Sequence, residues 1–433
     1  MSPSFSQHPQ RQTLNDEVHT RAPMMLHSPE AVSYLAFLHH EGSAGREPAH
    51  IAAFAAQLGL PEPDCSSGQV ILDAGDFRFR WSRHNEFSSY TFFRHIDSPD
   101  EAPDDHALRK VPAAWCSAIP GQLVVATHVM IRPDHEFNAE ALVAKHLAGE
   151  APMVVSQISS GAGWVFTDFH IHADGFSRFL VVNHSLTPRQ TGRTVQRLVE
   201  LETYRLIALL SFPVAKEVAR LLSRAEDDLS DLVQRMLQCA DDAEGEHRLL
   251  GHLTRLAADV EQSVATTTYR FDAGAAYYRL IKLRIEEMRE LRVTGFPTLQ
   301  EFMDRRLMPA METCATIAQR QEELSHRIAR NAQLLRTRVE VELQRQNQQV
   351  LEQMNRRARL QLRLQETVEG LSVVAITYYG SQLVHYFSKG IQPQLAPLTS
   401  EIITAMAIPL IAGCVFLSLR RMRKRLASEE KQN

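Results

Sequence analysis

The charge pattern of the C-terminal end constrains this chain most. Two apolar runs, Leu371–Phe387 and Ile402–Leu419, are separated by the loop Ser388–Ser400 and flanked on both outer sides by arginine. A membrane-spanning segment must satisfy its own backbone hydrogen bonds, which makes it a helix of about 17–25 mostly apolar residues. The second run has no charged residue and fits this description. The pattern predicts a hairpin of two transmembrane helices.

The first apolar run also carries polar residues on one side. On a helix they fall at i, i+3, i+4 and i+7, which is a single stripe. They are Tyr378, Ser381, Gln382 and His385. A polar stripe within lipid has to face protein or water. It therefore lines either a pore or substrate path, or a seam packed on the partner helix or a neighbouring subunit.

The distribution of arginine and lysine predicts the orientation, because positively charged loops stay on the cytoplasmic side. The connecting loop contains a single lysine, Lys389, whereas both outer flanks are basic. The flanking positive charges are Arg356, Arg357, Arg359 and Arg363 before the first run, and Arg420, Arg421, Arg423, Lys424 and Arg425 after the second. We therefore expect a two-pass protein with both termini in the cytoplasm.

The composition is that of a folding, reduced, cytoplasmic chain. Its 433 residues are 44% hydrophobic, which allows two or more domains with their own cores. The net charge of −4 gives no reason to expect nucleic-acid binding. The five cysteines form no CxxC pair, which argues against a disulfide framework or a zinc site. The N-terminus lacks an apolar stretch, so no signal peptide is expected.

Hydrophobic periodicity predicts a mixed N-terminal part. Ser28 and Pro29 are typical of a helix start, and the apolar spacing that follows predicts a helix to about His39. A second helix is expected at 51–58. Alternating patterns then predict strands. These lie at 70–72, 77–81, 87–93, 122–132, 152–159, 164–174 and 178–183, with a short helix at 140–147.

The sequence after residue 186 is predicted to be almost wholly helical. Thr187 and Pro188 start it, and helices are expected at 193–211, 213–239, 244–266 and 271–291. Thr298 starts a last helix, which Pro309 kinks or splits. This helix would continue into the first span as a stalk of about 90 residues, roughly 135 Å at the helical rise. An approximate coiled-coil seam comprises Leu324, Ile328, Ala332, Leu335, Val339, Leu343, Val350 and Met354, which predicts a homo-oligomer.

The predicted fold class is therefore α+β. It comprises a mixed α/β cytoplasmic domain at 1–186, a helical region at 187–297, a stalk at 298–370, transmembrane helices at 371–387 and 401–419 around an external loop at 388–400, and a basic tail at 420–433.

Three groups of polar residues in the N-terminal domain are candidate sites. Asn15, Glu17, His19 and Arg21 share a side whether the segment is extended or helical. Arg80, His84 and Glu86 lie near the end of a predicted hairpin and could converge. Each group could be a ligand or anion site, or a structural ion-pair cluster.

The third group is Asp168, His170, His172 and Asp174. On a strand these side chains project from one face. Histidine and aspartate in this arrangement could bind a divalent metal. The alternative is the solvated outer face of an antiparallel sheet.

Several segments resemble a known family. They are HPQRQTLNDEVHTRAP, RWSRHNEFSSYTF, GAGWVFTDFHIHADGFSR, TLQEFMDRRLMPAMETC and LQLRLQETVEGLSVVAITYY. They resemble an uncharacterised bacterial family of predicted membrane-anchored proteins, a domain of unknown function, over about Gln7 to Arg425. The resemblance implies anchoring in the bacterial inner (cytoplasmic) membrane. It supplies no activity, cofactor or catalytic residue.

The order of parts also resembles that of CorA-type magnesium channels. Those have a cytoplasmic α/β domain, a very long stalk helix that becomes the first span, and a second span with a basic tail. The Gly-Met-Asn motif of that family is absent here, where the chain reads Tyr386-Phe387-Ser388-Lys389-Gly390. In a channel of this kind, Lys389 would lie at the outer entrance of the pore, where its positive charge would repel cations.

The sequence contains no GxxxxGK[ST], HExxH or GxSxG motif and no GxGxxG after a strand, so it does not support an enzyme. Three hypotheses follow. The first is a membrane-anchored interaction or sensory protein that binds a protein or a small ligand and oligomerises through its stalk. The second is a CorA-like divalent-cation channel or transporter. The third is a metal-dependent enzyme. We favour the first, with cofactors unknown.

Overall fold

We analysed a computed structural model of the protein. It describes residues 5, 8–12, 14–15, 22–40, 42–96, 106–134, 147, 153–238, 243–390 and 400–429. The chain forms two compact units, which we describe separately. The first contains residues 1–240 and 248–333, and the second contains residues 241–247 and 334–433.

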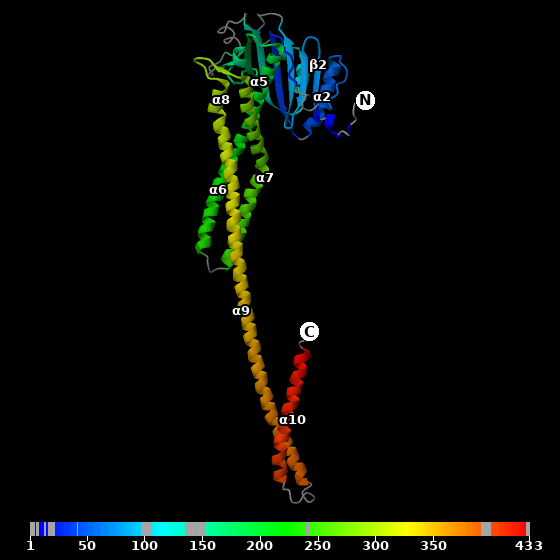
Figure 1. Ribbon diagram of the computed structural model, residues 1–433, viewed down its shortest axis with the longest axis vertical. Helices are drawn as coiled ribbons and strands as arrows, with labels where there is room; N and C mark the ends of the chain where they lie inside the picture. Colours follow the sequence, from blue (N-terminus) through cyan, green and yellow to red (C-terminus); the bar gives the residue numbers. More distant parts are fainter. Residues whose placement is uncertain are drawn as a thin grey trace. The chain divides into compact units, whose positions relative to one another are not determined.

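A mixed sheet organises the first unit, and the described residues contribute nine strands to it (Figure 1). The strand order is β2-β3-β4-β1-β5-β8-β7-β6-β9, and neighbours are antiparallel except for the parallel pair β5 and β8. The strands are β1 Glu30–Leu38, β2 Gln69–Asp73, β3 Arg78–Arg83, β4 Phe87–His95, β5 Gln122–Pro133, β6 Val154–Ile158, β7 Gly163–Thr167, β8 Ser177–Asn183 and β9 Leu291–Arg292. The predicted α+β class is confirmed.

The central strand β1 corrects one sequence prediction. A helix was expected from Ser28 to His39, but Glu30–Leu38 is a strand between β4 and β5. Every residue from Glu30 to Phe37 is buried. Because both faces of this strand are covered, most of its residues are apolar, and such a sequence also fits the spacing of a helix face.

The other predicted elements of this unit are mostly confirmed. The second helix is α2, Ser43–Gln57. The strand expected at 164–174 ends at Thr167, so the second half of that prediction is wrong. A turn precedes β8, and in it the φ angle of Gly175 lies in the left-handed region. The helix expected at 140–147 lies outside the described residues, apart from Leu147.

One face of the sheet is covered mainly by α5, Pro188–Leu209. As predicted, Thr187 caps this helix, and Gln190 completes a reciprocal capping box. The core beneath α5 also receives residues from the end of α7 and from α8. On the opposite face, α2, η1 (Ala107–Lys110) and α3 (Ala113–Ser117) cover the strands β2 to β5.

Two long helices follow α5 in the described chain. α6 spans Ser211–Gln238 and α7 spans Ala243–Met288. The break expected near Tyr269 is absent, so that prediction is wrong. No glycine or proline lies there to stop a helix, and the neighbouring threonines bond to carbonyls of the preceding turn: Thr267 Oγ1 donates to Ser263 O at 2.7 Å.

The predicted start and split of the last soluble helix are confirmed. Thr298 caps α8, Leu299–Arg306, with Glu301 in a capping box. The next helix, α9, spans Met308–Gly390, so the split falls immediately before Pro309. A proline is tolerated in the first turn of a helix because its missing N–H has no helical partner there.

The second unit contains the later part of α9 and the helix α10, Ser400–Glu429. Among the described residues, one helix segment, Ser400–Ser418, is long and apolar enough to cross a membrane, and only 6% of it is buried. This agrees with membrane association. Residues 371–387 are helical as expected, as part of α9, but they do not reach the same criterion.

Candidate functional site

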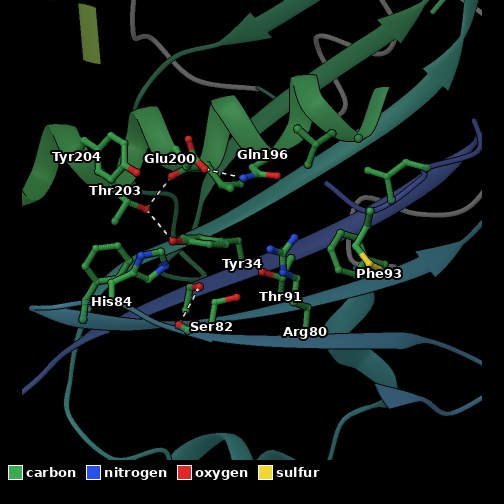
Figure 2. Close-up of a pocket in the computed structure, with 17 residues that line it drawn as sticks. Tyr34, Arg80, Ser82, His84, Thr91, Phe93, Gln196, Glu200, Thr203 and Tyr204 are labelled. Atoms are coloured by element: carbon green, nitrogen blue, oxygen red, sulfur yellow. Dashed lines mark hydrogen bonds between the residues drawn. The ribbon is translucent and has the colours of Figure 1, made fainter. Parts of the chain in front are cut away.

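A cavity of about 70 Å³ lies between the sheet and α5 in the first unit (Figure 2). Its walls come from β1, β3, β4, α5 and the segment that precedes β1. The cavity is lined by Met24, Leu26, Tyr34, Arg80, Ser82, His84, Phe87, Ser89, Thr91, Phe93, Gly192, Val195, Gln196, Val199, Glu200, Thr203 and Tyr204.

The register of β3 and β4 explains why the sheet wall is polar. Arg80 pairs with Thr91, and Ser82 pairs with Ser89. Directly paired residues project from the same face of a sheet, so these four side chains line the cavity together. Their chain neighbours are aromatic and project from the other face, where they pack in a buried core. The alternation of polar and aromatic residues along these strands therefore separates a polar cavity wall from an aromatic core.

Arg80 places a positive charge in this wall. The residue is only 9% exposed, and its Nη1 atom donates a hydrogen bond to the Ala22 carbonyl at 3.0 Å. The imidazole of His84 stacks on Phe87 with ring centroids 4.3 Å apart. The carbonyl contact fixes the guanidinium in a defined position beside the cavity.

The helix wall presents hydroxyl, amide and carboxylate groups. Thr203 Oγ1 contacts Tyr34 Oη at 3.0 Å and the Val199 carbonyl at 2.7 Å. Burial raises the pKa of Tyr34, so its phenol stays protonated at neutral pH. Gln196 Nε2 donates to Glu200 at 2.8 Å, and Glu200 also pairs with Arg284.

A glycine lets the segment before β1 approach α5 closely. A Cβ atom at Gly192 would lie 1.7 Å from the Met24 carbonyl oxygen. The backbone N–H of Leu26 also donates to the Pro188 carbonyl at 3.1 Å, at the start of α5. Any side chain at position 192 would push this segment away and open that end of the cavity.

The helix wall and the turn that joins the two strands of the sheet wall are both linked by ion pairs to α7. On the helix side, Arg284 contacts Glu200 and, at 3.0 Å, Glu287. Burial would lower the pKa of Arg284, but these carboxylates outweigh it and raise the pKa. On the sheet side, Arg270 binds both carboxylate oxygens of Glu86, at 2.9 and 3.2 Å. Glu86 lies in the turn between the two strands that form the sheet wall.

The structure separates the predicted residues of this region. Arg80 and His84 both line the cavity, whereas Glu86 binds Arg270 instead. Asn15 lies in a short exposed helical stretch. Glu17, His19 and Arg21 lie outside the described residues. Sequence reasoning missed the cavity residues of β1 and α5, because no local pattern shows that a distant helix covers a polar strand face.

The proposed metal residues follow β7 on a connection rather than on a strand. Asp168 Oδ2 lies 3.1 Å from His172 Nε2, and Asp168 Oδ1 accepts from the backbone N–H of His170 at 3.0 Å. Asp174 pairs with Arg178 at 2.7 Å. Within the described part of the chain, no group of three or more histidine, cysteine or acidic residues is arranged to hold a metal ion.

Arg178 also determines the charge state of Asp174. Burial would raise the pKa of Asp174, but hydrogen bonds from Arg178 and from the Phe176 backbone outweigh it and lower the pKa. The two carboxylates of the predicted set are therefore each engaged by a different side chain.

The four residues of the predicted polar stripe in the C-terminal hairpin differ in their partners and exposure. His385 Nδ1 lies 3.2 Å from Thr404 Oγ1, which joins α9 to α10. Ser381 is buried and donates to the Tyr378 carbonyl of its own helix at 2.8 Å. The Tyr378 side chain is 59% exposed, and Gln382 is half-buried.

The fold defines an α+β protein with long helices and one strongly apolar C-terminal helix. The chain belongs to the family described as protein of unknown function (DUF3422), whose model matches residues 6–426. No curated protein and no solved structure is significantly similar to it. The resemblance to CorA-type channels therefore remains a prediction from the order of parts.

Proposed function

We propose that this protein is a membrane-anchored sensory protein whose α+β domain binds a small polar ligand in the cavity beneath α5. The observation that carries the proposal is that the cavity residue Glu200 and the turn between β3 and β4, at Glu86, are both ion-paired to the same long helix, α7. A molecule that moved either wall would displace these pairs. Occupancy of the cavity would then be coupled to the helical part of the protein, as a sensor requires.

The cavity wall supports a small hydroxy acid or a related carboxylate as the ligand. Ser82, Ser89 and Thr91 offer hydroxyl groups, and Arg80 offers the planar cation that recognises carboxylates. The volume is small, about half that of an engineered apolar cavity of ~150 Å³ that binds benzene. It fits a molecule with a few non-hydrogen atoms.

The ion pairs Arg270–Glu86 and Arg284–Glu200 are largely shielded from solvent, which helps to keep their geometry fixed. Arg270 is 19% and Glu86 is 12% exposed, and Glu200 and Arg284 are similarly covered. Tyr277, on α7, packs against the cavity residue Tyr204 with ring centroids 5.4 Å apart and ring planes tilted by 35°. Burial, together with the Glu86 carboxylate, raises the pKa of Tyr277. These contacts form a continuous packed connection from the cavity to α7.

The membrane part of the proposal rests on α10, whose apolar side chains have almost no protein cover. We propose that it spans the bacterial inner membrane together with residues 371–387 of α9, with both termini in the cytoplasm. The His385–Thr404 contact supports a packed hairpin. A close approach also supports it, because a Cβ atom at Gly380 would lie 3.2 Å from Ile411.

Ligand binding can be tested on the full-length protein in detergent. Calorimetry with two- to four-carbon hydroxy acids, and with uncharged polyols of the same size, would identify the class. We expect an acid to bind and Thr91→Leu, which fills the cavity, to abolish the heat. The matched control is Thr254→Leu, the same change at an exposed position on α7. Absence of binding by every acid, or binding unchanged in Thr91→Leu, would contradict the ligand assignment.

The topology has its own test. In a cysteine-free parent, Lys389→Cys should react with a membrane-impermeant maleimide added outside intact spheroplasts, and Ser428→Cys only after permeabilisation. Equal protection of both positions would argue against two spans.

A further inference from the structure

The helix α9 has one face that is packed in the first unit. Gln321 Nε2 donates to Ser263 Oγ of α7 at 2.9 Å, and Arg320 Nε donates to Glu226 of α6 at 2.8 Å. Leu324 and Ile328 are buried on the same side. Spacings of three and four residues between such positions are those of helices packed along a seam. These contacts join α9 to α6 and α7 within a single chain.

The same spacing continues along α9 after the packed part ends. Leu343, Val350, Met354, Leu364 and Val368 are all between 55% and 67% exposed. At 3.6 residues per turn they fall within about 80° of one another. An apolar stripe of this length on a cytoplasmic helix requires a cover.

The charged side chains of this part of α9 lie mainly on the other side. On the same helical projection, Arg356, Arg359 and Arg363 fall within about 60° of one another and opposite the stripe. They are exposed. Of the basic residues between 343 and 368, Arg357 alone falls within the stripe. Gln361 also falls within the stripe, and Gln346 lies at its edge. A polar residue at such a position can fix the register of a helix pair.

We propose that the stripe from Leu343 to Val368 is covered by the same stripe of a second copy of this chain, in parallel. The orientation rests on the proposed membrane anchoring, because two copies held in one bilayer present their stalks in the same direction. Residues then face their own counterparts, Leu343 against Leu343 and Val350 against Val350. Along the sequence of α9, the proposed interface continues the seam that α6 and α7 cover at Arg320 and Gln321. Each copy keeps Arg356, Arg359 and Arg363 toward solvent. Arg357 faces its counterpart, and a single polar position of this kind fixes the register at some cost in stability.

Site-directed crosslinking in native membranes tests this arrangement. Single cysteines at positions 343, 350 and 364 are compared with Glu352→Cys and Arg359→Cys, which lie on the charged side. Because a disulfide requires Cα atoms within about 7 Å, we expect oxidation to join the stripe positions at least ~10-fold faster than the controls. Equal rates on both sides, no crosslinking at the stripe, or a crosslink to a different protein would overturn the proposal.

A pair of variants separates this proposal from the anchoring on which its orientation rests. In an antiparallel dimer, Leu343→Cys would join Val368→Cys of another chain and not itself. That pattern would overturn the parallel arrangement and count against the membrane anchor, whereas an absence of stripe crosslinks leaves the anchor intact.

A measurement on the protein with its native cysteines covers the case in which the cysteine-free parent fails to fold. Native mass spectrometry should give a dimer for the wild type and a monomer for Leu343→Lys/Val350→Lys. The control Glu352→Lys/Arg359→Lys should remain dimeric. A monomeric wild type, or the same mass for both double variants, would overturn the proposal.

Discussion

The two faces of strands β3 and β4 differ in a way that separates stability from binding. On one face, Phe54 of α2 stacks on Trp115 at 4.0 Å and meets the edges of Phe79 and Phe92. On the other face, hydroxyl groups and Arg80 line a cavity. A densely packed aromatic face can hold the strands in place, so the opposite face is free to carry polar groups that contribute little to folding.

The largest expected effect is on the aromatic face. Phe54 is fully buried between four other rings, so Phe54→Ala should lower the free energy of unfolding by about 3–5 kcal/mol. All three tryptophans lie in the sheet unit, so fluorescence during denaturant unfolding reports this unit. The control Phe296→Ala, at a partly exposed ring, should cost under about 1 kcal/mol. A small loss for Phe54→Ala would mean that the aromatic face is not the source of stability.

His128 is a polar exception on the packed face. It stacks between His106 and Phe176, and its Nδ1 contacts Ser33 Oγ at 2.9 Å. Burial, followed by the nearby His106, lowers the pKa of His128 to about 3. Its ordinary value is 6.5. The folded protein therefore keeps this imidazole neutral at a pH where the unfolded chain protonates it.

The consequence is a loss of stability in acid. The contribution is fully present above pH 6.5 and falls by up to about 1.4 kcal/mol per pH unit toward pH 3. Between pH 6.5 and 4.5 this amounts to about 2–3 kcal/mol. His128→Phe, which keeps the ring stacking, should flatten the dependence, whereas the exposed control His326→Phe should not. Parallel profiles for the wild type and His128→Phe would contradict the assignment.

The ion pair at the end of the β3–β4 turn should have an intermediate effect. Glu86→Gln removes the partner of a largely buried arginine and should cost about 1–2 kcal/mol. The exposed pair Arg336–Glu340 is the control, and Glu340→Gln should cost under about 0.5 kcal/mol. If ligand binding is coupled to α7, Glu86→Gln should also weaken it. Unchanged affinity would remove the coupling from the proposed function.

The sequence predicted much of the fold and little of the candidate site. The capping roles of Thr187 and Thr298 depend only on residues a few positions away, so the sequence predicted both helix starts correctly. The strand β1 was read as a helix because its identity depends on pairing with β4 and β5, which are distant in the chain. Arg80 and His84 were recognised as candidates, but Tyr34 and Glu200 were not. These two meet the sheet wall only after α5 packs on it, and no local spacing encodes that packing.

Two neighbouring serines on β4 give the smallest and most direct comparison. Ser88 is fully buried and contacts His39 Nε2 at 2.9 Å, whereas Ser89 lines the cavity and contacts the Ser82 carbonyl at 3.4 Å. Ser88→Ala should cost about 1–2 kcal/mol, because it leaves the imidazole without this partner. Ser89→Ala should cost under about 0.5 kcal/mol.

Calorimetric titration should give the opposite order for ligand affinity. Ser89→Ala removes a hydroxyl group from the cavity wall and should weaken binding about 5- to 10-fold, whereas Ser88→Ala should bind like the wild type. Because the two residues are adjacent on one strand and undergo the same substitution, the comparison contrasts the two faces that they occupy. Equal effects on both stability and affinity would show that the two faces do not divide these roles.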